Sequence, residues 1–500
     1  MRRYLPFLLL SVIAVVACSS AGSKAAKPDP RLTGAYMRPA QQGWYFVHLQ
    51  GPPGTIGYQN GYLLAPRIED LLQVVELEQT HDSHRPWSFF RTEAKAEMWP
   101  HIEAEYQQEL QGIADGVNAH GGHVDVWDIT ALNALEEWSY FIEQWDKNHP
   151  QQKVAQAQHR TGATGPQPGA GISGSLGAAE RGPAPIKAHY PGAGEHCSAF
   201  VATGAYTKDG KIVLAHNDWA NYLDGERWNI IYDIAPEHGY HFVMDGLPGV
   251  IHSADDFGEN AGGIIITETT ISDFHGYAFN KIPEFVRARK AMQYASSIQQ
   301  FAQIMEGGNN GGYANNWLVG DTKTNEIADL ELGLKVVTLS TSKSGFFVGS
   351  NFPVSPKLAR EETTFNRKDP ANSENARHTR WLQLMKQYKG KIDVADAKKF
   401  ESDHYDAILH KINPDYRTLC GHGEGQPTGD IPLDMGAVEG KATDAALAAN
   451  LSFWAVEGRP CGESFVAATF LKTHPQFAWE APELHDMPGH AWIEIKTGGK

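Results

Sequence analysis

The chain has 500 residues, a formal net charge of −16 at pH 7 and 41% hydrophobic residues. This apolar content is sufficient for a large core, and the length suits one large α/β fold as well as two domains. The acidic balance argues against a nucleic-acid-binding protein, which needs clustered Lys and Arg, and against electrostatic attachment to anionic membranes.

The first residues are typical of a secretory signal. Arg2 and Arg3 precede an apolar run at residues 5–17, which is too short for a conventional transmembrane helix. The run ends in Ala17-Cys18-Ser19-Ser20 and resembles a bacterial lipoprotein signal. This resemblance implies lipidation of Cys18, a tether over residues 18–40 and an exported protein anchored in the cell envelope, which we expect to face the periplasm at the outer membrane. An ordinary cleaved signal is the alternative, and it would leave the exported protein unanchored.

Residues 41–150 are predicted to be mostly helical, because apolar residues recur at spacings of three and four in segments 66–80, 101–118 and 126–145. Residues 151–196 are rich in Gly, Ala, Pro, Gln and Ser, so we expect a flexible exposed linker without a packed core. The linker ends at Cys197.

A β-hairpin is predicted directly after this linker. Apolar runs at residues 199–205 and 211–215 flank an Asp209-Gly210 pair, which is a strong hairpin signal. Pairing Tyr206 with Lys211 places Cys197 opposite Ala220, to within two residues. The hairpin therefore brings a polar cluster beside Cys197, consisting of His216, Asn217, Asp218 and Trp219.

A thiol beside an imidazole, a carboxamide and a carboxylate is the composition of a nucleophile with its orienting groups. The alternative is a small core cysteine next to a polar turn. Because a flexible segment ends at Cys197, the pattern favours a nucleophile that is exposed by processing.

Downstream of the hairpin, the sequence predicts strands at residues 229–234, 240–244, 263–270, 317–320 and 326–332. A long amphipathic helix is predicted at 282–306, and two more at 379–388 and 394–412. This order indicates an α+β fold in which helices pack on stacked sheets.

The remaining cysteines, Cys420 and Cys461, lie in C-terminal loops and are candidates for a disulfide in an exported protein. If these two cysteines pair, Cys197 is left as a free thiol. No Cys or His spacing matches a zinc motif, so the 22 histidines do not indicate a metal, and we expect no cofactor.

Several motifs carry a resemblance to a known family. Cys197-Ser198-Ala199-Phe200, followed by Thr207-Lys208-Asp209-Gly210 and His216-Asn217-Asp218-Trp219, is similar to the start of the mature catalytic chain in N-terminal-nucleophile hydrolases of the phospholipase B-like and acyl-coenzyme A:6-aminopenicillanate acyltransferase (C45 peptidase) type. Further similar segments lie at residues 43–63, 255–257, 268–270 and 313–317. The resemblance covers nearly everything from about residue 40 onward.

The resemblance implies a four-layer αββα sandwich with a helical prosegment, residues 41–150, that stays packed on the catalytic chain, residues 197–500. It also implies autocleavage between His196 and Cys197. An internal Cys nitrogen is an amide, whereas a new α-amine with a pKa of about 7.7–8.0 is a general base, so cleavage creates base and nucleophile together. A thioester formed with an amide or ester substrate is then hydrolysed by water.

The resemblance also assigns roles to individual residues. Asn315 or Asn316 matches the family's asparagine motif and is expected to stabilise the oxyanion, although an Asn pair after the Gly-rich residues 307–312 is in isolation a turn signal. His216 and Trp219 resemble the His-x-x-Trp element of the phospholipase B-like branch, while Asp218 takes the place of an aspartate that contacts the terminal amine. Only one of His216 and Asp218 need act directly.

Supporting roles are expected for Asn217 within the same motif and for Thr269 or Thr270, which would supply a hydroxyl or backbone contact. Arg377 resembles an arginine that steadies the thiolate. The alternative is a solvated arginine at the start of a helix.

Three functions remain open from the sequence. The first is a self-processing cysteine amidase that cleaves C–N bonds of small acyl amides by acyl transfer through a thioester at Cys197. The second is a phospholipase B-like hydrolase of lipid acyl esters. The third is a non-catalytic lipoprotein that binds ligands in the cell envelope, with the membrane contacted only through the lipid anchor in each case.

Overall fold

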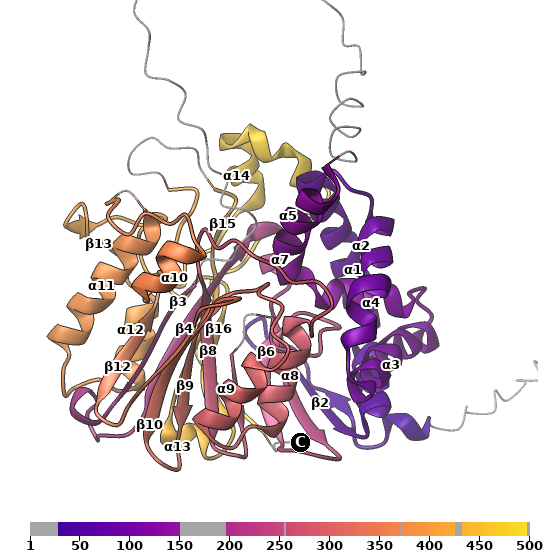
Figure 1. The fold of residues 1–500 in the computed structure, drawn as a ribbon, viewed down its shortest axis with the longest axis horizontal. Helices are drawn as coiled ribbons and strands as arrows, with labels where there is room; N and C mark the ends of the chain where they lie inside the picture. The colour runs from indigo at the N-terminus through magenta and orange to yellow at the C-terminus, as the bar shows by residue number, and fades with distance from the viewer. Residues whose placement is uncertain (1–28, 151–196, 255–256, 371, 426–432, 498–500) are drawn as a thin grey trace, which may run out of the picture.

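The computed structural model describes residues 29–150, 197–254, 257–370, 372–425 and 433–497 (Figure 1). The predicted signal, the lipidation residue Cys18, the linker at 151–196 and the cleavage residue His196 lie outside these described residues.

Two β-sheets form the centre of the fold. The larger one has nine strands, in the order β1 (Tyr36–Met37), β2 (Tyr45–Gly51), β5 (Ile230–Pro236), β6 (Phe242–Gly246), β7 (Gly258–Asn260), β8 (Ile264–Thr270), β9 (Asn315–Asp321), β10 (Glu326–Leu332) and β11 (Val337–Ser342). The smaller one has six strands, in the order β12 (Gly345–Gly349), β3 (Ser198–Thr203), β4 (Val213–Asn221), β15 (Met435–Asp444), β16 (Ser452–Glu457) and β17 (Ile493–Lys496).

The strands place alternate residues on opposite faces, and side chains from both faces of each sheet reach buried clusters. Ile265 and Leu318 of the large sheet pack against Val201 and Leu214 of the small sheet in one buried cluster. The neighbouring Trp317 belongs instead to the cluster that the large sheet forms with helices. The sheets therefore stack face to face, with helices outside them.

The helices form the two outer layers (Figure 1). Those packed on the large sheet are α1 (Pro53–Ser83), α2 (Trp87–Glu93), α3 (Ala104–His120), α4 (Val126–Asn133), α5 (Trp138–Asn148), α8 (Glu284–Tyr294) and α9 (Ile298–Glu306). Those packed on the small sheet are α11 (Ser373–Gln387) and α12 (Val394–Glu401). This arrangement confirms the predicted α+β, four-layer αββα sandwich.

Shorter elements connect the layers. They are α7 (Tyr222–Gly225), α10 (Pro356–Glu361), α13 (Ala445–Ala448), α14 (Ala467–Thr473) and the small hairpin β13 (Tyr405–Asp406) and β14 (Lys411–Ile412).

The N-terminal segment contributes more than helices. β2 alternates apolar and polar residues and pairs in parallel with β5, from Tyr45 opposite Ile230 to Gly51 opposite Pro236. The sequence-based prediction included this segment in the mostly helical region, residues 41–150, and missed the strand. Backbone hydrogen bonds as well as helix packing therefore join the predicted prosegment to the large sheet.

Glycines explain why α1 and α3 lie so close together. A Cβ on Gly57 would lie 1.9 Å from the Glu109 carbonyl oxygen, and one on Gly112 would lie 2.4 Å from the Gly54 carbonyl oxygen. Larger side chains at this crossing would push the helices apart.

Three predicted helices are shorter than expected. The 126–145 segment divides into α4 and α5, and the 282–306 segment divides into α8 and α9, where the Ser297 hydroxyl caps α9 by accepting from Gln300 N. A polar cap at Ser297 marks the break between α8 and α9, whereas a short 3₁₀ turn at Leu135–Glu137 separates α4 from α5. The apolar spacing alone revealed neither break. The 394–412 segment ends as a helix at Glu401.

Candidate active site at Cys197

The β3–β4 hairpin forms with the predicted register. Ser198 lies opposite Asn217 and Ala199 lies opposite His216, which agrees with the expected pairing to within two residues. Because side chains alternate along β4, His216 and Asp218 lie on one face and Asn217 and Trp219 on the other. The residues of this motif therefore contact two different layers of the fold.

Cys197 is fully buried at the start of β3. Its Sγ lies 3.2 Å from Asp218 Oδ1 and 3.9 Å from Glu268 Oε1, and its backbone N donates to Asn351 Oδ1 at 2.9 Å. The resemblance placed Asp218 at the position of an aspartate that contacts the terminal amine. In the uncut chain, Asp218 Oδ1 contacts the thiol and Asn351 accepts from the backbone nitrogen.

Arg377 of α11 holds the other side of the Cys197 backbone. One guanidinium nitrogen donates to the Cys197 carbonyl oxygen at 2.5 Å, and the other donates to Asn351 Oδ1 at 2.9 Å. The side chain is fully buried, so the alternative of a solvated arginine is wrong. Burial lowers the pKa of Arg377 to about 10, which leaves the group charged at neutral pH. These contacts fix the backbone of Cys197, and the guanidinium also interacts electrostatically with the Cys197 side chain.

Glu268 of β8 is held by neighbouring side chains. The Tyr313 hydroxyl donates to Glu268 Oε1 at 2.9 Å, and the Asn315 amide nitrogen, in the orientation that satisfies its neighbours, donates to Glu268 Oε2 at 3.0 Å and to the Ala314 carbonyl oxygen at 2.9 Å. Asn315 therefore positions a carboxylate next to the thiol.

Adjacent strand residues point to opposite faces, which separates the two candidate asparagines. Asn316 pairs across the sheet with Thr269, and its amide donates to Asp329 Oδ1 at 3.1 Å. Asn315 pairs with Thr270. The structure brings Asn315, and not Asn316, to the contacts around Cys197.

His216 lies close to the nucleophile. One ring nitrogen, the Cys197 thiol and a Glu268 carboxylate oxygen lie within 4.8 Å of one another. His216 Nδ1 is also 4.0 Å from Glu439 Oε1, which accepts from Asp218 N at 3.1 Å. The fully buried Lys441 contacts Glu439 and lies 2.6 Å from Asp245 Oδ2. A buried charged network thus supports the face that carries His216 and Asp218.

Asn217 and Trp219 face the α12 layer. The Asn217 amide donates to Glu401 Oε2 and to the Leu419 carbonyl oxygen, each at 2.9 Å. Trp219 Nε1 donates to Asn217 Oδ1 at 2.9 Å, and the Arg377 guanidinium lies 4.6 Å from the centre of the Trp219 ring system. Both residues therefore reach the nucleophile indirectly, through Arg377.

Thr269 and Thr270 are buried, and neither hydroxyl has a hydrogen-bond partner among the residues that the structure describes. Thr270 shares the face of Asn315, because the two lie directly opposite in β8 and β9.

The sequence reading missed Glu268, Tyr313 and Asn351 as site residues. Glu268 and Tyr313 stand inside segments that carried the family resemblance, so those segments were the available signal. Asn351 has φ of 60°, a left-handed conformation that Asn tolerates better than most residues. A Gly349-Ser350-Asn351 turn before Pro353 is only a weak sequence signal for such a role.

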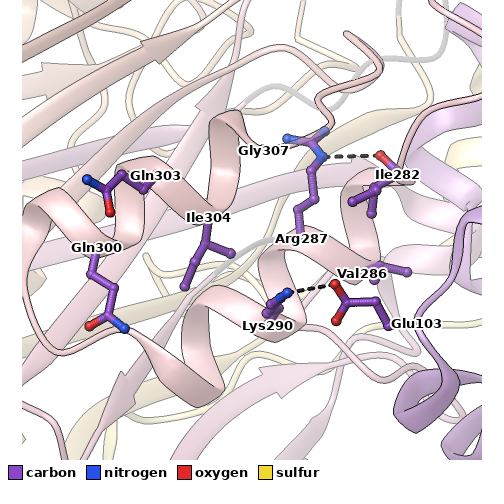
Figure 2. A pocket seen from close by; sticks show the side chains of 9 residues that line it. All are labelled: Glu103, Ile282, Val286, Arg287, Lys290, Gln300, Gln303, Ile304 and Gly307. Carbon is purple, nitrogen blue, oxygen red and sulfur yellow. Dashed lines mark hydrogen bonds and ion pairs between the residues drawn. The ribbon is translucent and has the colours of Figure 1, made fainter.

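Two surface pockets do not include this site. One has a volume of about 390 Å³ and is lined by residues of α8 and α9 and by Glu103 (Figure 2). The other, of about 570 Å³, lies around Arg31, Tyr58 and Tyr62. Cys197 itself is buried in the described conformation.

The predicted disulfide between Cys420 and Cys461 is not formed, and both residues are free thiols. They lie instead beside His404 and His422, with one ligand atom of each of the four residues within 4.8 Å of the others. The folding of the loops brings two histidines next to the thiols. A disulfide prediction made from the number of cysteines alone does not take such neighbours into account.

Comparison of the sequence with known protein families assigns this chain to one of them. The sequence model described as phospholipase B matches residues 80–493. The chain belongs to the phospholipase B family.

Relatives in this family are distant. An uncharacterized protein of Archaeoglobus fulgidus is 23% identical over 64% of this chain and 48% of its own length. A protein named putative phospholipase B-like 1 of Caenorhabditis elegans is 25% identical over 59% of this chain and 57% of its own length, and a phospholipase B of Crotalus adamanteus is 24% identical over 57% and 54%. The chain spans about half the length of these curated relatives.

Among solved structures, a single-residue variant of a conjugated bile acid hydrolase from Clostridium perfringens aligns with 51% of this chain and 88% of its own, at 10% identity and a TM-score of 0.31. The phospholipase B match includes Cys197 and every residue described around it. Within the described part of the chain, no helix has both the length and the hydropathy that crossing a membrane requires.

Proposed function

We propose that this member of the phospholipase B family is an acyl hydrolase that uses Cys197 as its nucleophile and activates itself by cleaving the His196–Cys197 bond. The family match supports a hydrolase. The observation that carries the proposal is the position of Cys197: Asp218 contacts its thiol at 3.2 Å, while Asn351 and Arg377 hold its backbone on both sides. A nucleophile needs this kind of fixed geometry beside a proton acceptor.

The proposed self-cleavage uses these contacts. Asp218 takes the thiol proton, and the sulfur adds to the carbonyl carbon of residue 196. The C–N bond then breaks as the Cys197 nitrogen takes up a proton, which leaves a thioester. Water hydrolyses the thioester, so that residue 196 ends in a carboxylate and Cys197 carries both a thiol and an α-amine.

The new amine supplies what the uncut chain lacks. It is a general base with a pKa of about 7.7–8.0 in model compounds, next to the nucleophilic sulfur of the same residue. When the thiol gives its proton to this amine, a thiolate and an ammonium form side by side and attract each other, while the net charge of the site does not change.

The substrate proposed first is a small acyl amide, whose C–N bond is cleaved through a Cys197 thioester, as in the C45 type of hydrolase. Asn315 is the oxyanion donor favoured by its position, and it would serve by releasing one of its two present acceptors. Thr270 is a second donor on the same face. A lipid acyl ester is the second candidate, favoured by the match to phospholipase B.

Two further parts of the proposal concern the whole molecule. Residues 41–150 stay bound to the catalytic chain after cleavage, a view supported by the parallel pairing of β2 with β5. The N-terminal sequence supports an exported protein that is anchored through a lipid on Cys18.

The test is the intact mass and N-terminal sequence of the purified protein beside its Cys197→Ala variant. We expect two fragments, the second beginning with Cys197, and a single chain in the variant. Thr203→Ala, at the other end of β3, serves as the matched control and should be cut normally. Processed protein is then assayed with N-acyl amides and with phospholipids. A wild-type chain that stays uncut would refute self-activation and favour a binding lipoprotein.

A further inference from the structure

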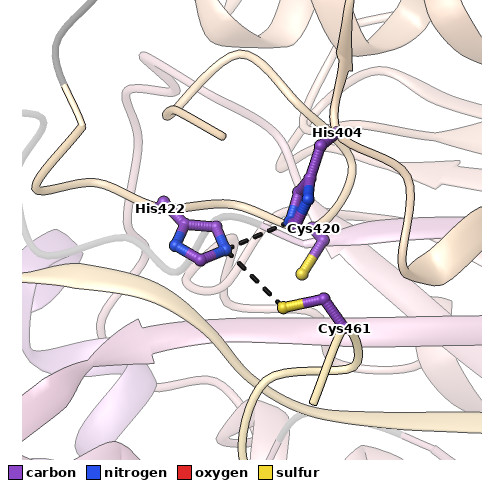
Figure 3. A group of neighbouring side chains, drawn as sticks. All are labelled: His404, Cys420, His422 and Cys461. Atoms are coloured by element: carbon purple, nitrogen blue, oxygen red, sulfur yellow. Dashed lines mark hydrogen bonds between the residues drawn. The ribbon is translucent and has the colours of Figure 1, made fainter. Parts of the chain in front are cut away.

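Four potential metal ligands converge from three separate loops near Trp219. His404 follows α12, Cys420 and His422 stand two residues apart, and Cys461 follows β16 (Figure 3). Figure 3 shows the two imidazole rings and the two thiols directed toward a common point. No local sequence motif requires these side chains to meet, so the fold itself creates the cluster.

The distances fit tetrahedral coordination. His404 Nε2 and His422 Nε2 lie 3.1 Å apart, Cys461 Sγ lies 3.7 Å from His422 Nε2, and the ligand atoms of all four residues are within 4.8 Å of one another. With zinc bonds of about 2.0–2.1 Å to nitrogen and about 2.3 Å to sulfur, tetrahedral geometry separates two nitrogens by about 3.4 Å and a nitrogen from a sulfur by about 3.6 Å. The observed separations need only small shifts to hold an ion.

The surroundings are those of a structural metal site. Cys420 and His422 are buried, while His404 and Cys461 are partly exposed, so an ion has a path of entry. The other ring nitrogen of His422, Nδ1, lies 3.5 Å from Glu424 Oε1, and Arg459 holds that carboxylate at 2.7 Å. A carboxylate behind a ligating histidine orients the ring and strengthens it as a ligand.

We propose that His404, Cys420, His422 and Cys461 bind one zinc ion as a closed, structural Cys₂His₂ site. Two thiolates and two imidazoles are the donor set that zinc prefers, and four protein ligands leave no position for a substrate. The site would cross-link three loops of the catalytic chain.

The cross-link would act on the layer behind the nucleophile. The Leu419 carbonyl oxygen, next to Cys420, accepts from Trp219 Nε1 at 3.2 Å. Gly421 packs so closely on this indole that a Cβ there would lie 2.0 Å from it. Since Arg377 stacks on Trp219 and holds the Cys197 carbonyl, the ion would fix the wall against which Arg377 is placed.

The test is the zinc content of the purified full-length protein, measured by inductively coupled plasma mass spectrometry after dialysis. We expect about one zinc per chain, falling to near zero in the Cys420→Ser/Cys461→Ser double variant. Cys197→Ala is the matched control, because Cys197, His216 and Glu268 form the other such group within the described residues, with ligand atoms within 4.8 Å of one another. It should retain the zinc.

Thiol chemistry on the wild-type protein gives a second readout that does not depend on how the double variant folds. With zinc bound, Cys420 and Cys461 should resist alkylation until a strong chelator is added, and the chelator should lower the melting temperature. A metal-free protein in which these two cysteines form a disulfide, read as a mass lower by two hydrogens and thiols that alkylate only after reduction, would overturn the proposal. Zinc retained by the double variant, or lost from Cys197→Ala, would overturn it too.

Discussion

Asp218→Asn offers the sharpest test of how the thiol is activated. The substitution keeps the shape of the side chain and removes its capacity to accept a proton from Cys197 Sγ, 3.2 Å away. General-base catalysis contributes about 10²–10⁴-fold to rate, which corresponds to about 2.7–5.5 kcal/mol of barrier. Because the thiol and the carboxylate are both fully buried, bulk water cannot readily replace the lost base. We therefore expect self-cleavage to slow by about 10³-fold.

The matched comparison is Glu268→Gln. Its carboxylate oxygen lies 3.9 Å from the sulfur, so its loss should slow cleavage far less. In Glu268→Gln, the new side-chain amide nitrogen would face the Asn315 amide nitrogen, which donates to Glu268 Oε2 in the wild type. One of these two donors would then lack an acceptor, and an unsatisfied buried donor costs about 1–3 kcal/mol of stability. Asp218→Asn should thus act mainly on rate and Glu268→Gln mainly on stability.

The assay is a time course of intact mass on freshly purified, uncut protein at neutral pH, with the melting temperature of each variant measured in parallel. Cleavage of Asp218→Asn at the wild-type rate would refute Asp218 as the proton acceptor. Equal slowing in both variants, with unchanged melting temperatures, would show that the two carboxylates act together.

Three further predictions concern the surrounding structure. Asn315→Ala should lower kcat by about 10²–10³-fold if its amide serves the oxyanion, whereas Asn316→Ala, on the opposite face, should lower kcat less than tenfold; steady-state kinetics that reverse this order would contradict the assignment. Gly421→Ala places a methyl group against Trp219 and should reduce the free energy of unfolding, measured by denaturant titration, by about 1–3 kcal/mol. The control is Gly54→Ala, whose added methyl would have its nearest neighbour 3.6 Å away and should be neutral or stabilising. Equal effects of the two substitutions would exclude packing as the cause. Burial, followed by repulsion from Glu284, raises the pKa of Glu137 from 4.5 to about 8, so the folded state favours the neutral acid and this contribution to stability is lost progressively as pH rises from about 4.5 to about 8. Melting temperatures should fall less between pH 6 and pH 9 in Glu137→Gln than in the wild type, and identical curves would contradict this origin.

Local patterns predicted the hairpin and much of the large sheet because their signals are short-range. Asp209-Gly210 between apolar runs defines a turn and therefore a register, and β10 begins and ends where its alternation indicated. β2 was missed because its seven residues precede a long helix, and its partner β5 lies in a distant part of the chain. Parallel pairing of this kind leaves no local turn signal.

The site was also predicted only where its residues lie close together in the sequence. Residues of one hairpin, such as Cys197 and Asp218, were found together because the turn determines their proximity. Asn351 and Glu268 were missed because they approach from other strands, and only the stacking of two sheets brings them to the thiol. The same limit applies to His404 and Cys461, since a spacing rule for zinc ligands detects only ligands that lie close in sequence.

These contacts also explain why one residue of a buried strand can be both a chain junction and a nucleophile. The nitrogen of Cys197 is held by Asn351 and its carbonyl oxygen by Arg377, so both backbone groups keep partners when the preceding bond is broken. An amine formed there would inherit the acceptor that the amide now uses, Asn351 Oδ1, and would remain beside the sulfur. Cleavage would then change the charge and basicity of the nitrogen while its position stays fixed, which is the preorganisation that acyl transfer by a terminal cysteine requires.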